Sequence, residues 1–176
     1  MRGPRTAYFV KMSPIDIQLR QDDARLVFLA VAYHLGRPGS ELDPLTKQPV
    51  EHGLAEVASS LQPQLNLAVA TISLREPQAK RLLSGMLGSI TELKAYPMLQ
   101  PRSGPEGRRS TVPGFDGTLT HLFPEVVEDV VESLNLAERM LMLKRRMDEA
   151  TAELEPEPAP PPEPKKRAWW PFGKKT

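Results

Sequence analysis

The residues of this chain that are best suited to bind a partner lie in segment 165–176. This segment contains five Lys and Arg, no acidic residue, and the only two tryptophans of the chain. Tryptophan favours the interface of a bilayer, and each cation near an anionic membrane surface contributes about 1 kcal/mol of attraction. Eight residues form the expected contact surface: Lys165, Lys166, Arg167, Trp169, Trp170, Phe172, Lys174 and Lys175.

Three kinds of partner would accept segment 165–176. An anionic membrane surface offers an interfacial layer for the rings, a protein groove offers specific pockets, and single-stranded nucleic acid offers bases for stacking. We favour the membrane slightly, because cations bracket the aromatic rings on both sides and Pro171 prevents a continuous amphipathic helix. A segment without any binding role is the alternative.

A second basic group lies in the Pro- and Gly-rich segment 97–120. Arg102, Arg108 and Arg109, with Lys94 nearby, could contact phosphates from a loop, as a winged nucleic-acid-binding domain uses its wing. The chain lacks the strong basic excess that such a domain normally has. We therefore favour a solvated loop without a binding role, and nucleic acid is the less favoured partner.

No group of residues has the spacing of a catalytic or metal site. The chain has no cysteine, which excludes a thiol nucleophile and Cys-ligated metals. Its three histidines, His34, His52 and His121, match no metal-binding spacing. Asp22 and Asp23 could form a carboxylate pair, but helix capping explains them more simply. The sequence predicts a protein that is not an enzyme and binds no cofactor or metal.

Composition and charge indicate a helical domain with appended segments. Hydrophobic residues make up 40% of the 176 residues and aromatics only 6%, so the core must be mainly aliphatic. The net charge of +1 divides into +3 over residues 1–122, −7 over 123–164 and +5 over 165–176. The longest apolar run, near residues 26–32, is too short for a membrane span of about 20 residues. We expect a cytoplasmic protein, with peripheral attachment to a membrane as an option.

Two strand–helix units follow one another along the chain. Alternating apolar residues predict a strand at 15–19, and a helix over 24–35 follows, capped by Asp22 or Asp23 and ended by a left-handed Gly36. A second strand is expected over 65–74. The next helix runs from Pro77 to Pro97, with an apolar face of Ala79, Leu82, Leu83, Met86, Ile90 and Leu93.

The two units match at an offset of 55 residues. Ile17, Leu19, Arg20 and Ala24 recur as Ile72, Leu74, Arg75 and Ala79. A true repeat would pair two strands into a small sheet under two helices. The alternative is that any strand followed by an amphipathic helix shows such matches.

The remaining elements are two helices and one long loop. Pro49 suits a first helical position, and the spacing of Val50, Leu54, Val57 and Leu61 predicts a helix that ends at Gln62. Residues 97–120 are expected to form a surface loop. A long helix is predicted over 123–152, with acidic residues early and basic residues late, as the helix dipole favours.

This last helix has two apolar stripes. The first comprises Val127, Val130, Leu134, Ala137 and Leu141, and the second comprises Leu136, Met140, Leu143 and Met147. Two stripes exceed what a single core contact needs, and methionine-rich faces adapt readily to partners. The second stripe is therefore the expected face of a coiled-coil homodimer.

The predicted organisation has five parts. A flexible segment 1–13 precedes a helical core domain, 14–122, which includes the loop 97–120. The long helix 123–152 follows, then a disordered Pro/Glu linker, 153–164, and the basic-aromatic tail, 165–176. We expect a non-enzymatic interaction or scaffold protein that docks through this tail, with a nucleic-acid-associated protein as the alternative.

Overall fold

The computed structural model describes residues 13–99 and 110–154. These residues form helices and one two-stranded sheet, which confirms the predicted mainly α class with a minor β component. Residues 1–12, 100–109 and 155–176 lie outside the described part of the chain. The predictions for the N-terminal segment, the arginine-bearing loop and the basic-aromatic tail concern these residues.

The two predicted strands are present and pair with each other. Strand β1, Ile15–Arg20, runs antiparallel to β2, Val69–Leu74, with Ile17 opposite Ile72. The side chains of β2 alternate strictly between buried and exposed, as expected for a strand with one face on a core. The second strand is shorter than predicted, because a turn of 3-10 helix, η1 (Gln62–Gln64), and its following turn occupy the residues before it.

Helix α1, Gln21–Gly36, is the central element that the sequence predicted. It is buried on several faces, and it contacts every longer helix of the described chain. Its last residue, Gly36, does not adopt the predicted left-handed conformation. A Cβ at this position would collide with the carbonyl oxygen of Pro113. The glycine is therefore required by a close backbone approach rather than by a helix cap.

The predicted cap at the start of α1 is also wrong. Asp22 and Asp23 lie inside the first turn, and no side chain caps the helix. Asp22 instead pairs with Arg139 at 3.3 Å, and Asp23 with Arg146 at 3.1 Å. These two ion pairs join α1 to the C-terminal helix, so neither carboxylate is free for the catalytic pair considered above.

Helix α2, Leu54–Leu61, starts later than predicted. Pro49 lies in an isolated bridge with Leu42 rather than at a first helical position. His52, which has a φ of 57°, then turns the chain before the helix begins. The apolar spacing correctly predicted a helix from Leu54 onward. The segment before it is held by backbone contacts within the same loop, where the amide of Val50 donates to the carbonyl oxygen of Glu41 at 2.8 Å.

Helix α3, Glu76–Ala95, followed by η2, Tyr96–Met98, confirms the helix predicted between Pro77 and Pro97. It crosses α1 at a close approach, where a Cβ on Gly85 would lie 2.8 Å from the carbonyl oxygen of Ala30. These two residues are 55 apart, as are Ile17 and Ile72 in the sheet. The matching positions of the two units therefore meet each other, which supports the hypothesis of a repeated strand–helix unit.

The prediction that residues 97–120 form one loop is wrong from residue 115 onward. Helix α4, Phe115–Leu122, buries Phe115, Leu119 and Leu122 and packs on α1. The ring of Phe115 lies edge-on to Tyr33, with centroids 5.7 Å apart and planes at 84°. The sequence concealed this helix because it is only eight residues long and follows a Pro-Gly pair.

The long C-terminal helix is divided in two. Helix α5, Glu125–Glu128, is followed by a turn and then by α6, Glu132–Thr151, which ends in η3, Ala152–Leu154. Asp129 causes the break, because its Oδ1 accepts a hydrogen bond from the backbone amide of Val131 at 2.9 Å. Aspartate commonly stabilises a helix start in this way and competes with a continuous helix.

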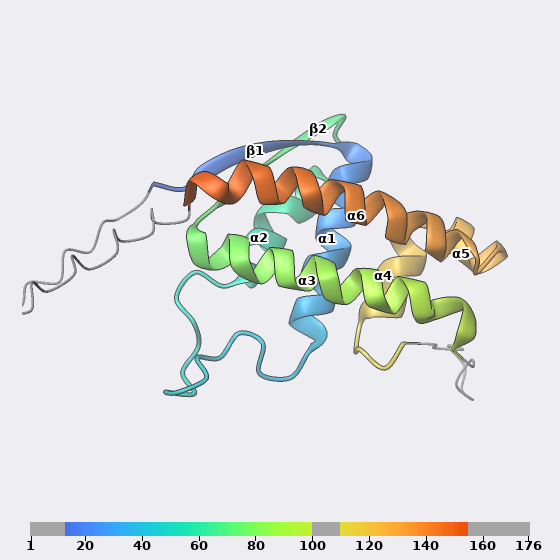
Figure 1. The fold of residues 1–176 in the computed structure, drawn as a ribbon, viewed down its shortest axis with the longest axis horizontal. Helices are drawn as coiled ribbons and strands as arrows, with labels where there is room; N and C mark the ends of the chain where they lie inside the picture. The colour runs from blue at the N-terminus through green and yellow to red at the C-terminus, as the bar shows by residue number, and fades with distance from the viewer. Residues whose placement is uncertain (1–12, 100–109, 155–176) are drawn as a thin grey trace, which may run out of the picture.

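The predicted oligomer face of α6 belongs to the core. Leu136, Met140, Leu143 and Met147 are each at most 2% exposed. Helix α6 has its most extensive contacts with α3, which runs beside it in the opposite direction (Figure 1). The prediction that this stripe is free to bind a second copy is therefore wrong. The other stripe is mixed, since Ala137 is buried whereas Val127 and Leu134 are exposed.

Candidate functional site

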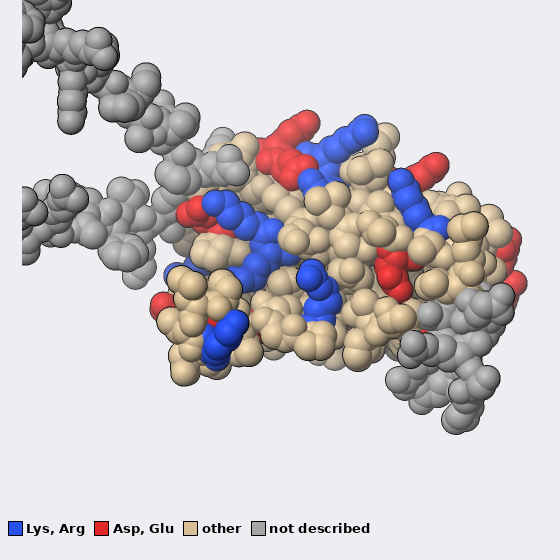
Figure 2. Space-filling model, turned by 60° about the horizontal axis from the view of Figure 1, so that its bottom comes forward, with Lys and Arg blue, Asp and Glu red and all other residues tan. Residues whose placement is uncertain are grey.

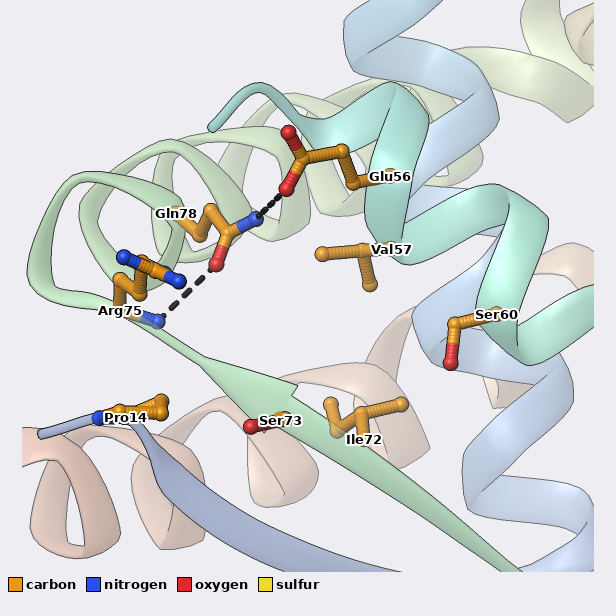
Figure 3. A pocket seen from close by; sticks show the side chains of 8 residues that line it. All are labelled: Pro14, Glu56, Val57, Ser60, Ile72, Ser73, Arg75 and Gln78. Atoms are coloured by element: carbon orange, nitrogen blue, oxygen red, sulfur yellow. Dashed lines mark hydrogen bonds between the residues drawn. The ribbon is translucent and has the colours of Figure 1, made fainter. Parts of the chain in front are cut away.

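A cluster of polar groups joins the starts of α2 and α3 (Figure 3). The side-chain amide of Gln78 donates to the carboxylate of Glu56 at 3.2 Å and to the carbonyl oxygen of Gly53 at 3.3 Å. Its Oε1 accepts a hydrogen bond from the backbone amide of Arg75 at 3.0 Å. Gln78 is only 3% exposed, so its donors and its acceptor are satisfied by these protein groups.

A hollow of about 230 Å³ opens beside this cluster. It is lined by Pro14, Glu56, Val57, Ser60, Ile72, Ser73, Arg75 and Gln78. Small-molecule sites usually measure roughly 300–1,000 Å³. This hollow is smaller, and its buried amide is already engaged in holding two helices together. The hydrogen bonds of Gln78 and Glu56 therefore connect α2 to α3, and we call this contact the α2–α3 joint.

His52 lies at the edge of this joint, near two carboxylates. Its Nδ1 is 3.4 Å from Glu56 and its Nε2 is 3.6 Å from Glu51. The imidazole is 30% exposed, and the two carboxylate side chains are 60% and 90% exposed. Contacts between groups this exposed to water contribute little to stability. The backbone carbonyl of His52 also accepts a hydrogen bond from Arg81, so the residue helps to shape the turn before α2.

His34 is the buried histidine of the fold. It is 6% exposed, and its Nε2 lies 3.0 Å from Oε1 of Glu41. The other carboxylate oxygen of Glu41 accepts a weak bond from the amide of Ala55, at the start of α2. Glu41 thereby ties the end of α1 to the start of α2. The sequence placed His34 at a helix end, as observed, but the pairing with Glu41 needed the tertiary structure.

A larger hollow, of about 630 Å³, lies between α1, η1 and α4. It includes Arg25 and His121, and its apolar side chains are Phe28, Leu65, Leu122 and Pro124. The guanidinium of Arg25 donates to the side-chain oxygen of Asn66 at 3.5 Å. Its charged or titratable lining residues are Arg25 and His121, and no carboxylate is among the residues that line it.

Neither a metal cluster nor a membrane span is found in the described part of the chain. Within residues 13–99 and 110–154, no three His, Asp or Glu side chains gather closely enough to hold a metal ion. No helix of these residues combines the length and the apolar character that crossing a bilayer requires.

The residues with the strongest predicted binding chemistry lie outside the described chain. These are Arg102, Arg108 and Arg109 of the loop and all eight residues of the tail. The described chain ends ten residues before the tail, at the start of the predicted linker. Leu154, the last described residue, is 3% exposed and packed in the core. The helix before the linker is therefore anchored up to its final residue.

Charge differs sharply between the fold and the tail. The described residues contain 12 Lys and Arg against 18 Asp and Glu, a net charge of −6, whereas residues 165–176 carry +5. On the face shown in Figure 2, basic and acidic side chains are interspersed. The net charge of the described fold is therefore opposite in sign to that of the tail.

Comparison of the chain with protein-family models, with curated proteins and with solved structures found no match.

Proposed function

We propose that this chain is a non-enzymatic interaction protein whose basic-aromatic tail attaches it to an anionic membrane surface. The observation that carries the proposal is the separation of charge: the fold has a net charge of −6, and residues 165–176 have +5 with both tryptophans. A fold of this charge is repelled by an anionic surface, and the tail carries the largest positive charge of the segments outside it.

The polar groups of the fold support a scaffold role. Gln78, Glu56 and His34 join helices to one another, and Asp22 and Asp23 pair with arginines of α6. Each of these contacts connects one element of the fold to another. Contacts of this kind, between side chains of different elements, favour a structural use for Gln78, Glu56, Asp22 and Asp23.

The expected strength of tail binding follows from its composition. Five cations near an anionic surface contribute about 1 kcal/mol each at low salt, and buried indole rings add to this. Increasing the salt concentration weakens the electrostatic part, because the Debye length falls from about 30 Å at 0.01 M to 8 Å at 0.15 M. Attachment should therefore be reversible and sensitive to salt.

Tryptophan fluorescence of the full chain tests this proposal directly. Trp169 and Trp170 are the only tryptophans, so all indole emission comes from the tail. Addition of vesicles that contain phosphatidylserine should shift the emission to shorter wavelength at low salt, whereas phosphatidylcholine vesicles should not. Trp169→Ala and Trp170→Ala should each weaken vesicle binding in part. No blue shift with anionic vesicles would refute the membrane proposal.

Two other outcomes would identify a different partner. Dependence on one tryptophan alone, with little effect of salt, would indicate a protein groove with a single hot spot. Salt-sensitive retention of an oligonucleotide, lost in the double variant Arg108→Ala and Arg109→Ala, would favour the nucleic-acid alternative. Either result, obtained without vesicle binding, would replace the membrane as the proposed partner.

A further inference from the structure

The hollow between α1, η1 and α4 has the size and the composition of a small-molecule site. Its volume of about 630 Å³ lies within the range of roughly 300–1,000 Å³ that is usual for such sites. Three elements form its walls: α1 supplies Arg25 and Phe28, the turn after η1 supplies Leu65, and α4 supplies His121 and Leu122. Apolar walls with a few polar groups are typical of ligand sites.

The charge of this hollow favours an anion. The guanidinium of Arg25 donates to Asn66 at 3.5 Å, the limit of a hydrogen bond, and within residues 13–99 and 110–154 it forms no ion pair with a carboxylate. An arginine has five N–H donors in a planar fork that matches a carboxylate. His121 supplies a further ring N–H, and no carboxylate is among the lining residues. This positive charge lies on a fold whose described residues have a net charge of −6.

Gly117 leaves one wall of the hollow without a side chain. It lies within α4, although glycine is the least favourable residue in a helix after proline. A Cβ at this position would meet no atom within 4 Å, and the φ of Gly117 is not positive, so neither packing nor backbone conformation requires a glycine. Gly36 and Gly85 differ in this respect, because a Cβ on either would collide with a carbonyl oxygen. What Gly117 does provide is open space in the hollow.

We propose that this hollow binds a small organic acid, a carboxylate attached to an apolar body. Arg25 and His121 donate to the carboxylate, and Phe28 and Leu65 contact the apolar body, which extends over the bare backbone at Gly117. The single permanent cation of the hollow matches the single charge of a carboxylate, whereas a phosphate ester carries about −1.5 to −2 at pH 7. The site consists of residues of the fold alone, so it is independent of the tail and of the partner that the tail binds.

Three matched probes test the chemistry of the ligand in calorimetric titrations of the full chain. 2-Naphthoate has both parts, 2-naphthalenemethanol has the rings without the charge, and acetate has the carboxylate without the rings. 2-Naphthoate should bind with a dissociation constant of about 1 mM or tighter, and the other two about tenfold more weakly or less. Equal binding of 2-naphthalenemethanol, or tighter binding of 2-naphthyl phosphate, would overturn the assignment to a carboxylate. No saturable binding of 2-naphthoate up to about 10 mM would overturn the site itself.

Removal of the cation tests whether Arg25 holds the carboxylate. Arg25→Gln should weaken the binding of 2-naphthoate by about tenfold or more, because the ligand loses a charge-assisted hydrogen bond. The matched control is Arg37→Gln, which makes the same change in net charge just after α1 and outside the hollow. It should change the affinity by less than about threefold, since long-range attraction is screened. Equal losses in the two variants would show that net charge alone attracts the probe and would overturn the site.

Filling the hollow tests where the ligand lies. Gly117→Leu should weaken the binding of 2-naphthoate by about tenfold or more, while the thermal midpoint stays the same or rises, because leucine favours a helix and a Cβ there meets no atom. Gly117→Ala adds a single carbon and should retain most of the binding. Binding of anionic vesicles should be the same in both variants and the wild type, which separates this site from the proposed function of the tail. Wild-type affinity for 2-naphthoate in a folded Gly117→Leu variant would overturn the proposed site.

Discussion

Truncation of a buried leucine on α6 tests whether its second apolar stripe is core or interface. Leu143 is 2% exposed, and Leu143→Ala removes three carbon atoms from the contact with the domain. At about 0.8 kcal/mol for each carbon, the lost burial amounts to roughly 2.4 kcal/mol. The cavity that remains raises the expected loss to about 3–4 kcal/mol of the free energy of unfolding.

Urea denaturation followed by circular dichroism measures this loss. With an m-value of about 2 kcal/mol per molar, the midpoint should fall by roughly 1.5–2 M. The matched control is Met142→Ala, one residue away on the same helix, where the side chain is 60% exposed. That change should alter the stability by less than about 1 kcal/mol.

The oligomer alternative predicts a different pair of results. A stripe that served as an interface between copies would leave the monomer stable in Leu143→Ala and would lower the mass seen by light scattering. Equal urea midpoints for the two variants, or a fall in mass specific to Leu143→Ala, would refute the placement of this stripe in the core.

Three further predictions follow from the packing and the charges. Gly85→Ala should destabilise the fold by about 1–3 kcal/mol, because a Cβ there would press on α1, whereas Gly117→Ala meets no atom within 4 Å and should be neutral or stabilising in thermal unfolding. Asp23→Asn breaks the pair with Arg146, in which the arginine side chain is 61% exposed and the aspartate side chain 18% exposed, and should lower the free energy of unfolding in urea by about 1 kcal/mol, with a smaller effect at high salt. The pKa of Asp43 should lie below its ordinary value of 3.8, because its charged form accepts the amides of Thr46 and then Leu45. The contribution of these hydrogen bonds to the stability of the fold is present above pH 3.8 and is lost as the pH falls through the lowered pKa. NMR titration of the Asp43 carboxyl measures this pKa.

Periodic apolar spacing located most elements of this fold. The strand at Ile15–Arg20, the helix Gln21–Gly36 and the helix Glu76–Ala95 appear where the pattern predicted them. The predicted match at an offset of 55 also has a spatial counterpart, since Ile17 pairs with Ile72. These elements could be predicted because their apolar residues keep a period of two or of 3.6 residues over a long stretch, even where one residue departs from the pattern.

Short or interrupted elements could not be predicted from the spacing of apolar residues. Helix Phe115–Leu122 was predicted as loop, because two turns of helix after Pro113 and Gly114 carry too little periodicity. The break at Asp129 was missed, because a single side-chain hydrogen bond to Val131 decides it within a stretch of good helical spacing. Both depend on interactions that a periodic pattern does not report.

For the proposed binding function, the sequence alone determined the chemistry of the tail, residues 165–176. The cations, the aromatic rings and the absence of cysteine follow from composition, and so does the charge of −6 on residues that later proved to form the fold. The tertiary structure decided which residues of the fold contact one another. It placed Leu143 against the domain, paired Asp23 with Arg146, and brought the start of β1 and the end of η3 to one end of the molecule. The physical reason is that apolar spacing specifies which side chains leave water, whereas their neighbours depend on how distant segments pack.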